Sequence, residues 1–481
     1  MSSIWKNYNA RLSYDGYFTD ENKLRKHAKI ISSILEKYGN KKLQEIEKNC
    51  QSTISARGIN FRVYAANNVA EDKKWPLDII PRIIPRSQWI KISKGLIQRA
   101  KALNLFIDDV YNEGKIFKDG IIPKDLVLKS KYYLKECKNF SPKFKAWSNI
   151  SGIDLIRNIF GEYLVLEDNL RVPSGVSYML ENRMVMHDVF PELFTRYRVS
   201  PIHQYTNKLY NCMQECITKK SKDPHMVVLT PGIYNSAYFE HSFLAEQMGI
   251  ALVEGKDLFV KNDNVFMKTV KGPLKVDCIY RRIDDNFLDP KVFYKKSVLG
   301  VPGLFKCWIK GNVSILNAPG TGIADDKAVY AYVEKIISYY LKEQPILRQV
   351  ETFLCSDKKQ RDYVIANMKK LVVKPTDGSG GSGIMIGPKA PIKEISEFIR
   401  KIKSKPDNYI AQPLEILSTV PTIAKDGIDP RHVDLRPFVL TGKNMYVTAG
   451  GLTRVALRKG STIVNSSKGG GSKDTLVING Y

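Results

Sequence analysis

The chain has 481 residues, of which 43% are hydrophobic and 10% aromatic, and its formal net charge is +26 at pH 7. This composition indicates a globular protein of two to four domains with ample material for buried cores. No apolar run reaches the roughly 18 residues that a membrane helix needs, and the N-terminus has no signal-peptide core, so we expect no membrane contact.

The seven cysteines are odd in number and scattered along the chain. Cys212 and Cys216 lie four residues apart without a second Cys or His pair at zinc spacing, so we expect them to share a helix face. The six histidines are isolated and indicate no zinc site. The sequence therefore predicts a reduced, cytoplasmic protein.

The positive charge raises the question of a nucleic-acid partner. The basic residues are mostly lysines spread along the chain, and no recognition motif with interleaved aromatic residues accompanies them. We interpret the lysine excess as a solvated surface that also favours anionic ligands. Specific nucleic-acid binding is the less favoured alternative.

The first segment, residues 1–130, reads as helical with basic surfaces, as in the stretch from Leu96 to Tyr111. The second, residues 131–222, begins with an acidic hairpin and continues through a helix over SYMLENRMVMHDVF. Both patterns have the apolar spacing typical of helices that cover a core.

The acidic hairpin is predicted from GIDLIRNIFGEYLVLEDNLR. Ile153–Ile156 and Tyr163–Leu166 are β-prone runs, and turn residues lie between them. A hairpin that turns about Phe160 and Gly161 pairs positions whose numbers add to about 321. That register sets Asp154 opposite Glu167, with Asn169 two residues on and therefore on the same face.

Two carboxylates directly opposite each other destabilise a strand pair unless something lies between them. A divalent cation would resolve the repulsion, since Mg²⁺ takes one or two carboxylates together with phosphate oxygens. The alternative is a solvated hairpin end at which Arg171 or Arg157 balances the acids.

The third segment, residues 223–344, alternates strand-like and helix-like stretches, which predicts βαβ units and a parallel sheet. Within it, PGTGIADD at 319–326 resembles a nucleotide loop. The favoured interpretation is a turn and helix cap, with Asp325 at the helix N-terminus.

The fourth segment, residues 345–481, contains LVVKPTDGSGGSGIMIGP. An apolar strand ends at Lys374, a glycine-rich loop follows, and a second apolar run begins at Ile384. Glycines let backbone N–H groups crowd around phosphate oxygens, and the lysine adds a positive charge. It is not a Walker A loop, because no G-K-[ST] follows and the loop leads into a strand. A flexible linker is the alternative.

Further cations follow in the same segment. Asp434 and Arg436 share one face of the strand HVDLRPFVL, and Arg454 lies in GGLTRVAL. A second loop rich in glycine and hydroxyl groups, VNSSKGGGSKDT, contains Lys468 and Lys473. Taken together, these stretches place cations and backbone donors within about a hundred residues of one another.

The phrases RVPSGVSYMLENR and APGTGIADDKAVYAYV, with the glycine-rich loop, resemble the circularly permuted ATP-grasp family, type 2, and more distantly glutathionylspermidine synthase. The likeness covers nearly the whole chain. It implies a mixed α/β (α+β) fold, an ATP-grasp with a parallel-sheet subdomain and a helical N-terminal region. The metal ligands Glu167 and Asn169 then precede Lys374, as the permutation requires.

The resemblance also implies cofactors and site residues. Mg²⁺ would be held by Asp154, Glu167 and Asn169. ATP would be held by Lys374 and the phosphate loop, by Gln412 of the hinge strand YIAQPLEI, and by Asp434. The loop residues concerned are Gly378, Ser379, Gly380, Gly381 and Gly383.

The implied activity is ATP-dependent carboxylate–amine ligation through an acyl phosphate. A guanidinium would stabilise the charge that develops at the acyl carbon, and the candidates are Arg454, Arg436 and Arg171. The carboxylate substrate would be bordered by Ser174, Gly175 and Ser177. The sequence identifies neither substrate nor the oligomeric state. A non-catalytic nucleotide-binding protein is the main alternative.

Overall fold

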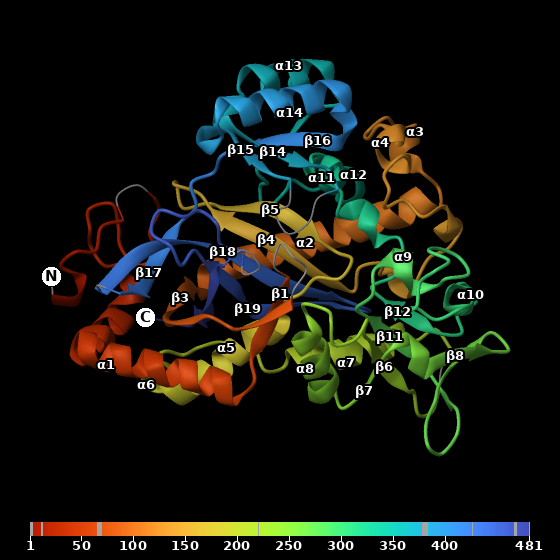
Figure 1. The fold of residues 1–481 in the computed structure, drawn as a ribbon, viewed down its shortest axis with the longest axis horizontal. Helices are drawn as coiled ribbons and strands as arrows, with labels where there is room; N and C mark the ends of the chain where they lie inside the picture. Colours follow the sequence, from red (N-terminus) through yellow and green to blue (C-terminus); the bar gives the residue numbers. More distant parts are fainter. Residues whose placement is uncertain are drawn as a thin grey trace.

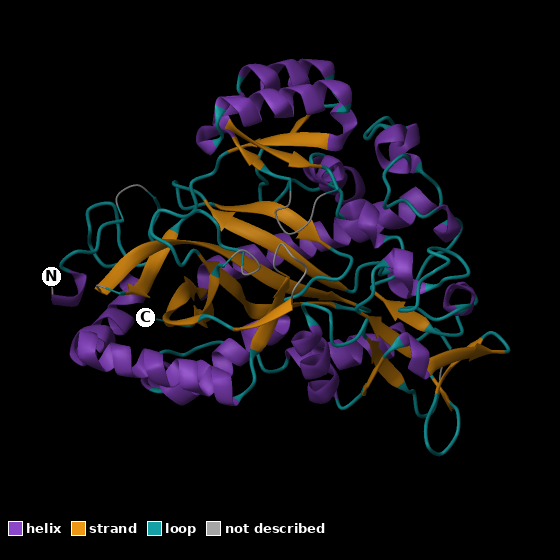
Figure 2. Ribbon diagram, in the orientation of Figure 1, coloured by secondary structure: helices purple, strands orange, loops and turns teal. Residues whose placement is uncertain are grey.

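The computed structural model describes residues 3–10, 13–64, 70–219, 221–377, 383–425, 427–465 and 469–480. A large seven-stranded sheet forms the centre of the molecule (Figure 1). A four-stranded parallel sheet and a small antiparallel sheet lie to either side of it, and helices cover all three (Figure 2). The predicted mixed α/β class is confirmed.

The large sheet draws its strands from distant parts of the chain. Its order is β3-β20-β19-β18-β4-β5, and β17 pairs with β18. All neighbours in it are antiparallel except β20 and β3, which run parallel. The strands span β3 (Leu77–Pro85), β4 (Ile150–Arg157), β5 (Tyr163–Asn169), β17 (Thr419–Ala424), β18 (Gly427–Thr441), β19 (Met445–Val455) and β20 (Gly471–Ile478).

Helices bury both faces of this sheet, which explains the apolar runs in its strands. Helix α2 (Arg86–Tyr111) covers one face, where Ile92 and Leu96 belong to one core cluster with Ile153 of β4. It begins ten residues before the predicted start at Leu96, because the apolar spacing continues toward the N-terminus through Ile92 and Trp89, both buried. Helices α1 (Lys29–Ala56) and α5 (Val176–Val189) cover the other face.

The predicted parallel sheet is present in the third segment. Its order is β12-β11-β6-β7, and every neighbouring pair is parallel. Helix α8 (Tyr238–Met248) connects β6 to β7, the next strand in the chain. The strands are β6 (Met226–Leu229), β7 (Ala251–Val253), β11 (Cys278–Arg281) and β12 (Ser314–Leu316).

The small sheet forms a separate lobe, at the top of Figure 1, that holds the end of the predicted phosphate-loop strand. Its order is β13-β16-β14-β15, and helices α13 (Lys358–Ala366) and α14 (Ile392–Ser404) pack on it. The strands are β13 (Phe353–Leu354), β14 (Leu371–Pro375), β15 (Met385–Ile386) and β16 (Tyr409–Pro413).

The sheets divide the chain differently from the four predicted segments. The segment 345–481 contributes to both the small lobe and the large sheet, and the segment 1–130 contributes β3.

The remaining strands are β1 (Asn60–Tyr64), β2 (Ala70–Lys74), β8 (Leu258–Lys261), β9 (Asn264–Met267) and β10 (Leu274–Lys275). The remaining α-helices are α3 (Lys115–Lys118), α4 (Lys124–Leu128), α6 (Glu192–Arg196), α7 (Tyr205–Cys216), α9 (Asp285–Leu288), α10 (Leu304–Ile309), α11 (Lys327–Tyr330) and α12 (Val333–Leu341). The 3₁₀ turns are η1 (Ser3–Trp5), η2 (Lys26–Ala28), η3 (Lys135–Cys137), η4 (Lys143–Lys145), η5 (Gly255–Asp257), η6 (Thr321–Ala324), η7 (Met368–Lys370), η8 (Gly387–Lys389) and η9 (Pro406–Asn408).

Candidate active site between the large sheet and the small lobe

The β4–β5 hairpin places Asp154 directly opposite Glu167, as its register predicted. The same register does not hold near the turn, where Leu155 pairs with Val165. A bulge at Leu166 joins the two registers by adding one residue to β5. The strand pairs on either side of the bulge therefore keep their side chains on the same faces of the sheet. Gly161 closes the turn with φ +82°, a conformation that favours glycine.

Each of the two opposed carboxylates is paired with its own cations. Arg436 donates to Asp154 from Nε (2.5 Å) and Nη2 (2.8 Å), and Arg454 Nη2 donates to Asp154 Oδ2 (2.8 Å). Lys327 Nζ lies 2.9 Å from Glu167 Oε1. The predicted balance by Arg171 or Arg157 is wrong, because Arg171 pairs with two aspartates elsewhere and Arg157 Nε donates to the Gly161 carbonyl.

Asp154, Asp434, Arg436 and Arg454 form one buried network on β4, β18 and β19. Arg454 also donates to Asp434 through Nε (2.9 Å) and Nη2 (2.5 Å). Burial alone would raise the pKa of Asp154, but the two guanidinium groups outweigh burial and lower that pKa to about 2. Two of the predicted site residues, Arg436 and Arg454, therefore hold Asp154 in its charged form.

Lys374 reaches toward the hairpin from the end of β14. Its Nζ donates to Gln412 Oε1 on the neighbouring strand β16 (2.6 Å), and Gln412 Nε2 donates in turn to Thr352 (2.9 Å). Burial lowers the pKa of Lys374 to about 8, and the Glu167 carboxylate partly offsets that effect. The predicted adenine contact of Gln412 stays a prediction, and its side-chain oxygen is occupied by Lys374.

Lys374, Gln412, Glu167 and Lys327 surround one cavity between the small lobe and the large sheet, with Asp325 also in its wall. Its volume is about 10 Å³, room for roughly one water molecule. The structure thus brings the predicted phosphate lysine and a predicted metal ligand to the same place, although they are about two hundred residues apart in the sequence.

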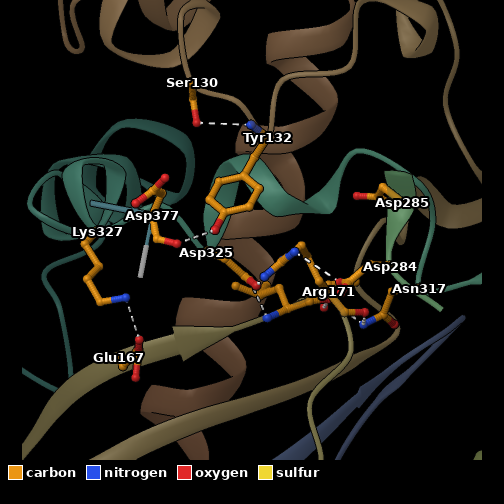
Figure 3. A network of polar contacts seen from close by, with 12 residues as sticks. Ser130, Tyr132, Glu167, Arg171, Asp284, Asp285, Asn317, Asp325, Lys327 and Asp377 are labelled. Atoms are coloured by element: carbon orange, nitrogen blue, oxygen red, sulfur yellow. Dashed lines mark hydrogen bonds and ion pairs between the residues drawn. The ribbon is translucent and has the colours of Figure 1, made fainter. Parts of the chain in front are cut away.

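Three contacts hold the base of the glycine-rich segment, and Figure 3 shows the one between Tyr132 and Asp377. Lys327 N donates to the Thr376 carbonyl (3.2 Å), and Tyr132 Oη donates to the Asp377 carbonyl (2.9 Å). Lys131 Nζ lies 2.7 Å from Asp377 Oδ2. Gly378, Ser379, Gly380 and Gly381 lie outside the described residues, and Gly383 has φ +69°.

The predicted cap at Asp325 is wrong by one residue. Asp326 is the N-cap of α11, since its side chain accepts from Ala328 N (2.9 Å). Asp325 instead accepts from Leu170 N (2.6 Å) and from Arg171 Nε (3.0 Å), as Figure 3 shows. Burial raises the pKa of Asp325 to about 6, although Arg171 opposes that shift.

Arg171 does not lie beside the Asp154 network. It joins Asp325 on one side and Asp284 Oδ1 (3.1 Å) on the other, and its guanidinium lies 4.6 Å from the ring centre of Tyr132. This arrangement connects the strand end after β5 to the segment that holds Asp377.

Ser174, Gly175 and Ser177 surround a carboxylate of the protein itself. Glu240 Oε2 accepts from Gly175 N (2.7 Å), Ser177 N (3.1 Å) and Ser177 Oγ (3.0 Å). Glu240 is fully buried and also pairs with Arg282 Nη2 (3.2 Å), which donates to Ser174 Oγ. Their predicted contact with a substrate carboxylate stays a prediction.

Lys473 of the second glycine-rich stretch does not form part of a phosphate loop. It lies inside β20, fully buried, where its ammonium pairs with Asp78 and donates to the carbonyls of Ile80 and Pro421 (2.9 Å each). Lys468 lies outside the described residues.

The predicted metal ligands offer oxygen donors. Asp154 Oδ1 accepts one hydrogen bond, so it keeps a second acceptor site, and Glu167 Oε2 has no partner among the described residues. Asn169 Nδ2 is buried and likewise without a hydrogen-bond partner in the described part of the chain. Two carboxylates and an amide fit Mg²⁺, which prefers hard oxygen ligands and keeps phosphate or water oxygens.

No cluster of three His, Cys, Asp or Glu side chains suited to a metal ion occurs among the described residues. The same residues contain no helix with the length and apolar character for crossing a membrane.

Sequence reasoning missed Lys327, Tyr132 and Lys131. The signal for Lys327 was its place directly after two aspartates at the start of a helix, within the distinctive phrase APGTGIADDKAVYAYV. No local pattern marked Lys131 and Tyr132, because their role follows from a contact about 245 residues away.

The chain is similar in sequence or in fold to several known proteins. A protein of unassigned function from Synechocystis sp. is 50% identical over 439 residues, 91% of each chain. A protein from Frankia alni with the provisional name glutamate–cysteine ligase 2-3 is 39% identical over 465 residues, 96% of this chain and 54% of that protein. A glutathione synthetase-like effector from Globodera pallida has a similar fold, with a TM-score of 0.56 at 11% identity over 92% of this chain and 98% of the effector.

The family described as circularly permuted ATP-grasp type 2 matches residues 81–456, a span that includes Asp154, Glu167, Asn169, Lys374 and Arg454. With most of the chain matched and the two halves of the site meeting at one cavity, this protein belongs to the circularly permuted ATP-grasp family, type 2.

Proposed function

We propose that the protein is an ATP- and Mg²⁺-dependent carboxylate–amine ligase that acts through an acyl phosphate. The observation that carries the proposal is the meeting of Lys374 with Glu167 and Lys327 across the cavity between the two lobes. Membership of the ATP-grasp family and the ligase name of the Frankia alni relative support it.

The phosphates of ATP need positive partners, and two lysines supply them. Lys374 extends from β14 and Lys327 from the first turn of α11, so both reach the cavity from rigid elements. Lys327 is paired with Glu167 in this structure. When a triphosphate enters, we propose that Lys327 exchanges that carboxylate for a phosphate oxygen, because a charge-assisted hydrogen bond forms in either case.

Asp154, Glu167 and Asn169 would hold Mg²⁺, which when bound supplies neutralisation of the phosphate charge. Lys374 and Lys327 would orient the γ-phosphoryl group for in-line attack by a substrate carboxylate, with ADP as the leaving group. An amine would then attack the acyl carbon and expel phosphate, which forms the amide bond.

We assign stabilisation of the developing negative charge to Arg454, with Arg436 as a second donor. Arg454 Nη1 makes no hydrogen bond with the described residues, whereas all three nitrogens of Arg436 donate to Asp154 or to the Ser174 carbonyl. Ser174 therefore lies beside the arginine pair, which supports a carboxylate substrate near the start of α5. Arg171 is the weakest candidate, since two aspartates bind it.

The proposal is tested by ADP release in the presence of ATP and Mg²⁺, with amino acids, peptides and polyamines offered as acid and amine in pairs. Glutamate with cysteine is the first pair to try, because the Frankia alni relative is named for it. ADP release that needs both an acid and an amine, and that Glu167→Gln abolishes, is the expected result. Tight ATP binding without turnover for any pair would favour a non-catalytic nucleotide-binding protein.

A further inference from the structure

A second cavity lies on the face of the β4–β5 hairpin that α2 covers, away from the ATP side. Its volume is about 400 Å³, within the range of small-molecule sites. Its wall includes Gln88 and Lys91 of α2, Arg157 of β4, and Arg348 of the segment that follows α12. Three cations therefore surround one cavity, and Glu162 is the one acidic residue in its wall.

These cations lack acidic partners. Lys91, Arg157 and Arg348 form no ion pair with the described residues. Arg157 is only 9% exposed, stacks on the rings of Tyr14 (4.0 Å) and Tyr163 (4.7 Å), and donates only its Nε, to a backbone carbonyl. Its two terminal nitrogens therefore keep donors that an anion could accept from.

The wall contributed by α2 also favours an anion. Gln88 and Lys91 lie in the first two turns of this 26-residue helix, which has no side-chain cap and no acidic residue in its first turn. Its N-terminal N–H groups and dipole therefore add to the positive potential.

Apart from Glu162, most of the remaining wall is apolar, with Leu164 and Leu347 buried beside the cations. This combination suits a ligand with anionic oxygens at its ends and a short apolar middle. We propose that this cavity binds a small dianion, either a dicarboxylate or a phosphate, as a site separate from the ATP cavity.

The cavity is connected to the active-site strand by backbone hydrogen bonds. Val165 N donates to the Arg348 carbonyl (2.9 Å), and Val350 N donates to the Val165 carbonyl (3.0 Å). Val165 lies two residues from Glu167 on β5. A ligand that draws Arg348 inward therefore acts on the strand that carries the proposed metal ligand.

The test is calorimetric titration at fixed ionic strength with two probes, glutarate and inorganic phosphate. Arg348→Ala and Lys91→Ala should each weaken binding roughly 10-fold or more, the usual effect of losing one charge-assisted hydrogen bond. Lys94→Ala is the matched control, because Lys94 is an exposed lysine one turn further along α2 and outside the cavity wall. Glutarate alone or phosphate alone as the bound probe supports the site and identifies its ligand chemistry.

Three results would overturn the proposal. Neither probe binding the wild-type protein is the first. Equal weakening by Lys94→Ala and Lys91→Ala is the second, since it would mean non-specific attraction to a protein of charge +26. Loss of probe binding in Lys374→Ala instead of Arg348→Ala is the third, because the anion would then occupy the ATP cavity. The ATP affinity of Arg348→Ala is measured separately, so that a failure of the proposed anion site can be told apart from a failure of the proposed ATP site.

Discussion

At the scale of single residues, the charge of Lys374 depends strongly on its surroundings. Its ordinary pKa of 10.5 is lowered to about 8 by burial, so the free protein loses this charge as the pH rises through 8. Phosphate binds the charged form, and bound phosphate would in turn raise this pKa. ATP affinity is therefore expected to be full near pH 7 and to fall as the pH rises above about 8.

The measurement is ATP affinity from pH 7 to pH 9.5 in the wild type and in Lys374→Arg. An arginine keeps its charge over this range, so the variant should show a flat profile whatever its absolute affinity. A wild-type profile as flat as that of the variant would show that Lys374 does not meet the phosphates.

Arg454 has a structural role beside its proposed catalytic one. It is bound by Asp154 and Asp434, both buried, so Arg454→Ala leaves two buried carboxylates with one fewer cation. Breaking a buried pair in this way costs about 3–5 kcal/mol. We expect a lower denaturation midpoint as well as lost turnover.

Asp434→Asn in the Arg454→Ala background separates the two roles. Removing one of the opposed charges should recover part of the lost stability but none of the turnover. Recovery of turnover together with stability would assign Arg454 to folding alone, and would leave Arg436 as the group that meets the acyl phosphate.

At the scale of elements, β5 carries two of the proposed metal ligands, Glu167 and Asn169, and substituting either one should cost little stability. Glu167 is 34% exposed and its ion pair with Lys327 is partly solvated, so the pair contributes at most about 1 kcal/mol to stability. Glu167→Gln and Asn169→Ala should therefore abolish turnover while the unfolding midpoint stays close to that of the wild type. Near-normal ADP formation by either variant at moderate Mg²⁺ would exclude the hairpin as the metal site.

The segment around Tyr132 should fix the end of β14, which carries Lys374. Tyr132→Phe removes the hydrogen bond to the Asp377 carbonyl but keeps the ring beside Arg171. A single hydrogen bond of this kind contributes about 0.5–1.5 kcal/mol. We expect a several-fold higher KM for ATP, little change in kcat, and faster amide hydrogen exchange in residues 371–377.

Tyr133→Phe is the matched control for that variant, because Tyr133 Oη has no hydrogen-bond partner among the described residues. A kcat that falls in Tyr132→Phe while KM stays constant would point to a part in the chemistry instead of in positioning.

At the scale of the whole molecule, the ATP cavity is too small for its proposed ligand. A volume of about 10 Å³ admits a water molecule and no triphosphate, so we predict that the small lobe moves away from β5 before ATP enters. The observed rate of ATP binding should therefore level off at high ATP concentration, at the rate of this opening. Stopped-flow measurements on the wild type would show it.

Tyr132→Phe should raise that limiting rate, since it removes one of the contacts between the small lobe and the remainder of the molecule. A binding rate that rises linearly with ATP concentration up to the highest practical value would mean that no opening step precedes binding.

Features that depend on neighbouring residues could be predicted from the sequence, and features that depend on packing between distant segments could not. The hairpin register at Asp154 and Glu167 was predictable because turn residues and alternation are local signals, and the bulge at Leu166 was not, because it depends on packing over the sheet. The parallel sheet of residues 223–344 was predictable from its βαβ rhythm. The place of Lys374 at the end of a strand was predictable from the apolar run before it and the glycine-rich stretch after it.

The partners of charged residues were not predictable, because each depends on a contact between distant segments. Lys473 resembles a loop lysine in sequence, yet Asp78 meets it in the core, 395 residues away in the chain. Glu240 of α8 accepts a hydrogen bond from Gly175 N at the start of α5, a stretch that was expected to border a substrate carboxylate. Burial decides these pairings, and burial is a property of the complete fold.

The parallel pairing of β3 with β20 has a consequence for how the chain becomes a protein. These neighbours lie far apart in the sequence, so β3 lacks this partner until residues 471–478 have left the ribosome. Contacts of such long sequence separation form slowly, and the chain exposes unpaired strands while it waits. The central sheet is therefore completed only after β20 is synthesised, and changes that weaken the pairing of β20 with β3 should reduce soluble yield more than equal changes in surface loops.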